Sequence, residues 1–426
     1  MTLFAERSGT DIVLSREDKE ELIRESAEQF GNPGRVLILP PDFTRFHSGS
    51  GELTSIYYTC LTETGSDVDI LPALGTHKKM TDREIDTMFG SDIPKERFLV
   101  HDWRKGIRKM GEIPSSLIQE LSEGKLDYSI DVELDSALAD GDYDLILSVG
   151  QVVPHEVIGM ANHNKNIFVG AGGQDIINKT HFLGAVYNME RIMGRAESPV
   201  RSVLDYAEKT FLGDVNVIYV LTVMSRNDEG VMDMNGLFIG PGREPYEKAA
   251  RLSRELNISK MESPLDRVVV YLDPDEFKST WLGNKAVYRT RMVMADAGEL
   301  FIIAPGLARF GEDSDIDGLI RKYGYVGTPR ILEAVEANED LRENLSAAAH
   351  LIHGSSEGRF NITYAPGSVT REEITSVNFS YCSLDEAFEK YDPGNLKDGF
   401  NTLKSGERIY YISNPAVGLW GLDQDF

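Results

Sequence analysis

Cysteine is scarce in this sequence, because only Cys60 and Cys382 occur among 426 residues. Two cysteines so far apart give neither a disulfide framework nor a CxxC metal-binding motif, so any bound metal must have other ligands. Positive charge is also in deficit, since 44 Lys and Arg against 69 Asp and Glu leave a net charge of −25. This charge repels nucleic-acid phosphates and anionic membrane surfaces, and we expect neither nucleic acid nor a membrane as a partner.

Long apolar runs are missing as well. No run approaches the roughly 20 residues that cross a bilayer, and the first seven residues lack the basic and apolar parts of a secretory signal. We therefore expect a cytoplasmic protein. Apolar residues make up 41% and charged residues 27%, which excludes wholesale disorder, and the length predicts about two or three globular domains.

Short β-branched segments alternate with helical patterns along the chain. The clearest strands are expected at 35–39, 67–71, 144–149 and 215–220. One helix is expected to begin at Ser15, with Asp18 as its capping partner, and another at Thr81, with a capping box to Glu84. The alternation predicts the α/β class: two domains with largely parallel sheets flanked by helices.

A polar segment at 259–264 interrupts this pattern after a helical stretch, and new apolar runs follow it. We expect an N-terminal α/β domain over 1–262 and a C-terminal α/β domain over 267–399. The second domain would close over an active site in the interdomain cleft. The strand-like sequence at 408–412 leaves open that residues 400–426 return to the first domain.

Polar residues follow three of the expected strands. Asp42, Thr44 and Arg45 follow the first strand, His77 follows the second, and His155 follows the third. Ligands of open parallel sheets bind beyond the carboxyl ends of the strands, so these side chains could share one cleft. Each alone has an ordinary explanation, such as a local ion pair or a surface histidine. Their coincidence at three strand ends favours a functional site.

Three histidines and a lysine gather within 27 residues: His155, His163, Lys165 and His181. Neutral imidazole suits Zn, Cu, Fe and Ni, but the spacing fits neither an HExxH helix nor a zinc finger. A hydrolase or lyase in which His77, His155 and His181 hold a metal directly stays open. The glycine cluster at 170–173 lacks a full GxGxxG and does not indicate a dinucleotide site.

The order and spacing of these motifs resemble the nickel-dependent lactate racemase family, which comprises 2-hydroxy acid racemases and epimerases. The shared pattern consists of Asp-x-Thr-Arg at 42–45, Gly-Thr-His at 75–77, Met-Thr at 80–81, Pro-His at 154–155, Gly159, Lys165, His181 and Lys-Ala at 285–286.

The resemblance implies an isomerase with a tethered cofactor, the nickel-pincer nucleotide (nickel pyridinium-3,5-bisthiocarboxylic acid mononucleotide). Lys165 would carry this group covalently, and His181 would be a nickel ligand. Asp42 and Thr44 would contact the cofactor or orient neighbouring residues. Proteins that synthesise the cofactor are implied as partners.

The same resemblance implies how the substrate is handled. His77 and His155 would be the acid/base pair, while Arg45 and Lys285 would hold the carboxylate of a small 2-hydroxy acid. Loss of hydride from C2 leaves a hydroxyl that must lose its proton, and a neutral imidazole can accept it. Racemisation returns hydride to the opposite face of the substrate, so the family would need one histidine on each side.

Three departures from the family pattern surround the expected pocket. Ala-Asn-His stands at 161–163 in place of Ser-Gly-Gly, Leu282 in place of Gln, and Phe46 in place of Pro. They predict a substrate larger or more polar than lactate. His163 would be either an added substrate contact or a loop residue hydrogen-bonded to its neighbours. A non-catalytic relative that only binds the cofactor stays open.

Overall fold

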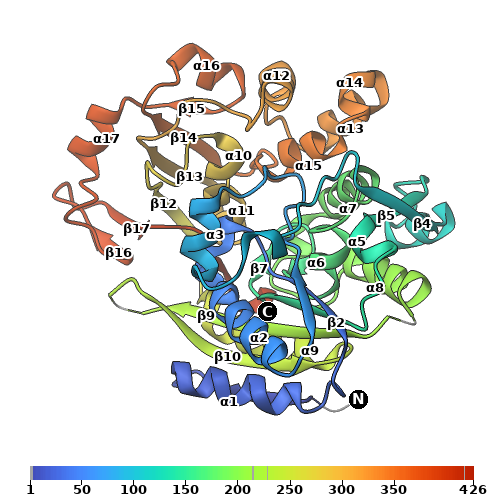
Figure 1. Ribbon diagram of the computed structural model, residues 1–426. Coiled ribbons are helices and arrows are strands. Elements are labelled where there is room, and N and C mark those ends of the chain that lie inside the picture. The colour runs from blue at the N-terminus through green and yellow to red at the C-terminus, as the bar shows by residue number, and fades with distance from the viewer. Residues whose placement is uncertain (1–2, 214, 228, 417) are drawn as a thin grey trace. The chain divides into compact units, whose positions relative to one another are not determined.

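The computed structural model describes residues 3–213, 215–227, 229–416 and 418–426. The chain forms two compact units, one comprising Met1–Thr180 and Gly194–Asn257, the other His181–Met193 and Ile258–Phe426. Helix α7 (Gln174–Tyr187) contains the point where the first unit gives way to the second. Figure 1 shows the elements of both units.

The first unit is built on a six-stranded sheet with the order β1-β10-β9-β6-β2-β3. Four strands run parallel to their neighbours: β9 (Val217–Arg226), β6 (Leu145–Gln151), β2 (Arg35–Leu39) and β3 (Asp67–Ile70). Strands β10 (Met232–Gly240) and β1 (Ala5–Ser8) are antiparallel at one edge. The four predicted strands are confirmed, and the three that precede the polar motifs (β6, β2 and β3) are adjacent.

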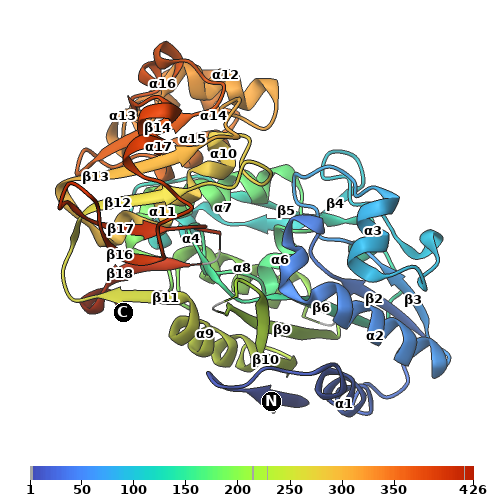
Figure 2. The same ribbon diagram turned by 90° about the vertical axis from the view of Figure 1, so that its left-hand side faces the viewer.

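Helices cover this sheet because its strands are apolar toward both faces. In β2, the four residues from Val36 to Leu39 are fully buried, as expected for a strand within a parallel sheet. Helices α1 (Arg16–Ala27), α2 (Ser50–Glu63) and α3 (Asp82–Phe89) share one apolar core with a face of the sheet. Helix α9 (Glu244–Asn257) lies against β9 and β10 (Figure 2).

Local sequence signals set the helix starts. Ser15 and Asp18 form the predicted capping box of α1, and Thr81 and Glu84 form that of α3. Gly90 ends α3. Further elements of the first unit are η1 (Phe43–Ser48), η2 (Lys95–Arg97), β4 (Ile107–Ile113), α4 (Ser115–Leu121), β5 (Ile130–Asp135), α5 (Ser136–Ala139), β7 (Pro154–His155), β8 (Gly159–Met160), α6 (Asn164–Phe168) and α8 (Pro199–Phe211).

The second unit has its own six-stranded sheet, with the order β15-β14-β13-β12-β17-β16. The parallel strands are β15 (Ser380–Tyr381), β14 (Asn361–Pro366), β13 (Met294–Ala304), β12 (Leu265–Tyr271) and β17 (Arg408–Ile412), and β16 (Gly399–Thr402) is antiparallel. Its helical elements are η3 (Met189–Arg191), α10 (Thr280–Gly283), α11 (Lys285–Thr290), η4 (Arg291–Val293), α12 (Ser314–Tyr323), α13 (Thr328–Ala337), α14 (Glu339–Arg342), α15 (Leu345–His353), α16 (Arg371–Ser376), α17 (Leu384–Lys390) and η5 (Asp423–Asp425).

The C-terminal segment differs from the return to the first domain that the sequence left open. Strand β17 pairs with β12, and Ile409 and Tyr411 join the apolar core around Val269. The sequence predicts an interruption of regular structure at 259–264. Part of this segment instead forms a strand, because β11 (Ile258–Met261) pairs in parallel with β18 (Leu419–Leu422). Residues 400–426 therefore belong to the second unit.

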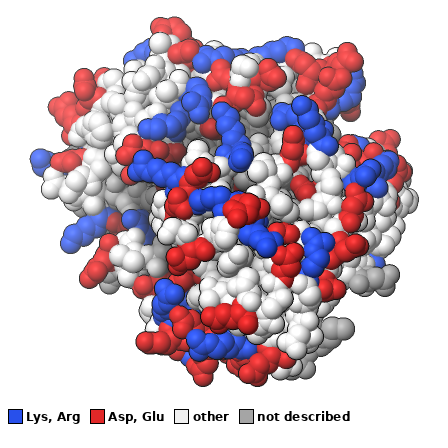
Figure 3. Space-filling view, in the orientation of Figure 1, with Lys and Arg blue, Asp and Glu red and all other residues white. Residues whose placement is uncertain are grey.

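The α/β class with largely parallel sheets flanked by helices is confirmed. In the part of the chain that the structure describes, no helix combines the length and apolar character needed to span a membrane. Acidic and basic side chains are interspersed on the face drawn in Figure 3, so charges of both signs alternate across it despite the net charge of −25.

Candidate functional site

Asp42 and His77 form a hydrogen-bonded pair beyond the ends of β2 and β3. His77 Nδ1 lies 2.6 Å from Asp42 Oδ2. Asp42 Oδ1 accepts hydrogen bonds from the Thr44 backbone N–H at 3.2 Å and from the Thr44 hydroxyl at 2.5 Å. The Asp42 side chain is 7% exposed and the His77 side chain 51%. A carboxylate on Nδ1 makes this nitrogen the donor and leaves Nε2 of a neutral ring as a proton acceptor.

The charge of Asp42 is maintained by these contacts. Burial alone would raise the pKa of the Asp42 carboxyl, but hydrogen bonds from His77 and Thr44 lower the pKa below its ordinary value. Asp42 is therefore an ionised group that fixes the orientation and the tautomer of His77.

His155 lies in β7, just beyond β6, and its side chain is 12% exposed. The Val157 backbone N–H donates to His155 Nδ1 at 3.1 Å. Because Nδ1 accepts this bond, a neutral His155 ring carries its proton on Nε2. Glu156 Oε2 is 3.5 Å from the same Nδ1. The two histidines thus differ: His77 presents an acceptor nitrogen and His155 a donor nitrogen.

Lys165 is held at the same sheet edge by its helix. The neighbouring Asn166 donates from Nδ2 to Leu39 O at 2.8 Å and to Ser148 Oγ at 3.2 Å, which ties α6 to β2 and β6. The loop that carries His77 is tied to the end of the same helix, since Gly75 N–H donates to Gly170 O at 2.7 Å.

The amine of Lys165 is easier to deprotonate than that of a surface lysine. Burial, and after it the positive charge of Arg45, lower its pKa to about 8, while Glu156 opposes the shift. A substantial neutral fraction is then present near neutral pH, which gives the amine nucleophilic character.

The predicted residues divide between the two units. Six of them occupy loops and elements at one edge of the first sheet: Asp42, Thr44, Arg45, His77, His155 and Lys165. Lys285 belongs to the second unit, where its Nζ is 3.8 Å from Glu276 Oε1 and 5.4 Å from the Phe277 ring centroid. His181, on α7, is also counted with the second unit.

Several polar residues of α8 were missed by the sequence reasoning. Arg201, Asp205 and Glu208 recur at helical spacing on one face, a pattern usually typical of a solvated surface. They instead contact the loop before Lys165. His163 in that loop is 1% exposed, and its Nε2 lies 2.9 Å from Gly242 O. Of the two roles considered for His163, the structure shows the hydrogen-bonded loop residue.

His163, Asp205 and Glu208 are also the only group of potential metal ligands found within the described residues. His77, His155 and His181 are not gathered into such a group there. The alternative of a hydrolase or lyase whose metal is held directly by these histidines is therefore not supported.

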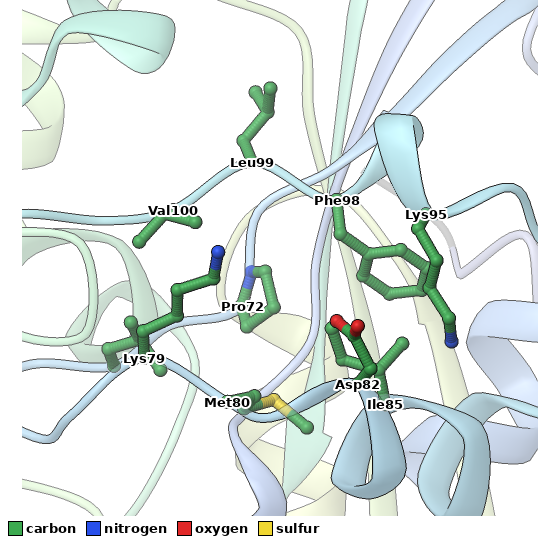
Figure 4. A pocket seen from close by; sticks show the side chains of 10 residues that line it. Pro72, Lys79, Met80, Asp82, Ile85, Lys95, Phe98, Leu99 and Val100 are labelled. Carbon is green, nitrogen blue, oxygen red and sulfur yellow. The ribbon is translucent and has the colours of Figure 1, made fainter.

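A small pocket lies beside the His77 loop but includes none of the predicted site residues. Figure 4 shows Lys79 and Lys95 at its sides and Phe98 and Ile85 among its apolar lining. Its complete lining is Pro72, Leu74, Lys79, Met80, Asp82, Ile85, Lys95, Phe98, Leu99 and Val100. Because His77, His155 and Lys165 do not line it, this pocket is not the candidate site.

The chain is an α/β protein that carries a histidine–carboxylate pair, a second histidine and a lysine at the carboxyl ends of parallel strands. Residues 20–194 match the family model of the lactate racemase N-terminal domain. No protein of curated function matches the sequence.

Two solved structures resemble the whole chain. A protein from Thermotoga maritima, solved as a structural genomics target, has a TM-score of 0.81 and 23% identity, covering 98% of this chain and 100% of its own. Lactate racemase apoprotein from Thermoanaerobacterium thermosaccharolyticum has a TM-score of 0.70 and 18% identity, covering 96% and 94%. Residues 20–194 thus match the lactate racemase N-terminal domain, and the chain has a lactate racemase-like fold.

Proposed function

We propose that this protein is a racemase or epimerase of a 2-hydroxy acid that uses a nickel-pincer nucleotide tethered to Lys165. The observation that carries the proposal is the convergence of the Asp42–His77 pair, His155 and Lys165 at one edge of the first sheet. The match of residues 20–194 to the family model of the lactate racemase N-terminal domain supports the reaction class.

The residues of this chain fit the cofactor. Lys165 combines burial with a pKa of about 8, which suits an amine that forms a covalent link. His181 would supply an imidazole ligand, a donor that nickel accepts readily. When bound, the group would supply an electron-poor carbon that accepts and returns hydride.

The two histidines would move the proton of the substrate hydroxyl. The hydrogen bond to Asp42 leaves His77 Nε2 able to accept a proton, and the bond from Val157 places the proton of neutral His155 on Nε2. One imidazole therefore starts as base and the other as acid, and they exchange these roles in the reverse direction.

Fixed cations would hold the substrate carboxylate. Arg45 offers a planar pair of donors and Lys285 a point charge, a combination that permits the 2-oxo group to turn while the carboxylate stays bound. The changes at Phe46 and Leu282 point to a substrate larger or more polar than lactate.

Covalent loading provides the first test. The chain is co-expressed with cofactor-synthesis enzymes and compared with Lys165→Ala by intact mass and nickel analysis. We expect a mass increment and bound nickel in the wild type only. An increment that persists in Lys165→Ala, or none in either protein, would contradict the proposal.

Turnover provides the second test. The loaded protein is assayed for loss of optical rotation with a panel of enantiopure 2-hydroxy acids, among them polyhydroxylated ones. Asp42→Asn should retain nickel yet lose about 100-fold in kcat, because His77 loses its orienting carboxylate. Full loading without turnover of any acid would favour a non-catalytic cofactor-binding relative.

A further inference from the structure

Arg201 is a fully buried arginine whose guanidinium contacts the loop before Lys165 at several points. Nη2 donates to Met160 O at 2.9 Å, and both terminal nitrogens lie 3.2 Å from Asn162 O. Nη1 also donates to Asn164 Oδ1. A planar guanidinium can hold two carbonyls and an amide at once, whereas a lysine ammonium lacks this fixed geometry.

Asn164 joins the loop to two further residues of α8. Its Nδ2 donates to Asp205 Oδ1 at 2.7 Å and to Glu208 Oε2 at 2.9 Å. Arg201, Asp205 and Glu208 occupy one face of the helix, and we refer to these three residues as the α8 clamp. The Tyr219 hydroxyl donates to Glu208 Oε1 at 2.6 Å, so the clamp continues into the sheet.

The loop held by the clamp has a strained backbone. Asn162 has φ 63° and His163 has φ 60°, and these two residues directly precede α6. Non-glycine residues with such φ values are strained and persist only where the surroundings hold them. The direction in which α6 starts, and with it the position of Lys165, thus depends on contacts with α8.

His163, Asp205 and Glu208 have the donor types of a metal site, but the two carboxylate charges are already compensated. Arg243 pairs with Asp205, and Asn164 Nδ2 donates to both Asp205 and Glu208. A divalent cation would have to displace the Asn164 amide and lie near two guanidinium groups. Like charges at this range oppose one another strongly in a buried setting.

We propose that Arg201 is a positioning residue, which, with Asp205 and Glu208, holds residues 160–164 so that the Lys165 amine is presented for covalent modification. The functional meaning rests on the proposed role of Lys165 as the tether. The contacts themselves are independent of it. Burial and nearby positive charges, Arg201 among them, lower the pKa of Lys165, so a loosened loop changes how the amine titrates.

The test reads the Lys165 amine directly in the full chain, expressed without cofactor. Reductive methylation with formaldehyde and cyanoborohydride is followed at Lys165 by peptide mass spectrometry, from about pH 6 to about pH 10. The wild type is compared with Arg201→Met and Arg201→Lys. Arg291→Met is the matched control, because Arg291 is a buried arginine that holds the carbonyls of Ile352 and His353 in the second unit.

Both Arg201 variants should move the pH midpoint of Lys165 methylation upward, while Arg291→Met keeps the wild-type midpoint. If the midpoint rises by about one pH unit, the fraction of neutral amine near pH 7.5 falls about eightfold. Arg201→Lys retains the positive charge but loses the planar contacts. It therefore separates the effect of this charge on the Lys165 amine from the effect of holding the loop. If it keeps the wild-type midpoint, charge alone explains the result and the positioning role is wrong. A wild-type midpoint in folded Arg201→Met would also overturn it.

Asn164→Ala covers the case in which Arg201→Met does not fold. It removes the acceptor for Arg201 and the donor to both carboxylates, and should raise the midpoint and speed hydrogen exchange at residues 161–164. Unchanged exchange and midpoint would refute the clamp. Stoichiometric Ni²⁺ or Zn²⁺ binding that is lost in His163→Ala would show a metal site instead. Because no cofactor is used, failed loading at Lys165 would refute the proposed function without altering this result.

Discussion

At the scale of single residues, His163 combines an unfavourable backbone with a buried side chain. Its φ of 60° and ψ of −137° favour glycine, while its ring is 3.9 Å from that of Tyr219. His163→Ala and His163→Gly both leave a cavity, but only glycine relieves the strain. We expect the alanine variant to be less stable than the glycine variant by about 1 kcal/mol, measured by urea unfolding.

The matched control is Arg251, an exposed residue within α9. At this position the alanine variant should be the more stable one, because glycine in a helix interior costs about 1 kcal/mol relative to alanine. The same order at both positions would mean that the backbone at 163 is unstrained.

The sequence shows that residues 161–163 depart from the family pattern, but it does not show how the fold makes room for them. Asn162 and His163 stand where the family pattern has two glycines. In the structure, Asn162 and His163 keep the positive φ values that glycine favours. The Asn162 side chain uses the space left by Gly150, where a Cβ would lie 1.6 Å from its Nδ2. This fit depends on residues distant in sequence, so no local pattern could predict it.

At the scale of elements, α3 follows the loop of His77 and begins with a capping box. Glu84 N–H donates to Thr81 Oγ1 at 3.3 Å, and Thr81 N–H donates to Glu84 Oε2 at 2.7 Å. Thr81→Ala removes one of these bonds and should lower the free energy of unfolding by about 1 kcal/mol. Thr59→Ala, at an exposed site within α2, is the control for chemical unfolding and should have an effect below about 0.5 kcal/mol. Equal losses would exclude a specific capping contribution.

Elements with local signals were predicted well, and elements without them were not. The caps at Ser15 and Thr81 depend on residues three positions apart, so the sequence sufficed. Strand β11 extends into the segment that was expected to break the pattern, and it pairs with β18, which is distant in sequence. The polar face of α8 looks solvent-exposed in sequence, yet Arg201 is buried because the loop before Lys165 folds over it.

At the scale of the whole molecule, the sequence predicted that three strand ends lie together, and adjacency of β6, β2 and β3 confirms this. It did not predict that the boundary between the compact units crosses α7 between Thr180 and His181. A continuous helix shows no change of composition at such a point. The predicted roles of His181 and Lys285 therefore depend on tertiary structure to a greater degree than those of Asp42 and His77.

The stability of the whole chain should depend on pH through Lys165. Burial lowers the pKa of its ammonium group from 10.5 to about 8. Between these values the unfolded chain binds more protons than the folded chain, so this contribution to stability rises with pH across that interval. Below about pH 8 the folded protein holds a positive charge that is partly removed from solvent.

Lys165→Met removes that charge and keeps a side chain of similar reach. We expect the variant to be more stable than the wild type by about 1–3 kcal/mol near pH 7, with the advantage lost near pH 10.5. Urea unfolding of the full chain at both pH values measures this, with Lys260→Met, at an exposed position, as the control. A variant less stable than the wild type near pH 7 would mean that contacts of the ammonium group outweigh its burial. The expected gain instead indicates that a reactive amine is maintained at this position at a cost in stability.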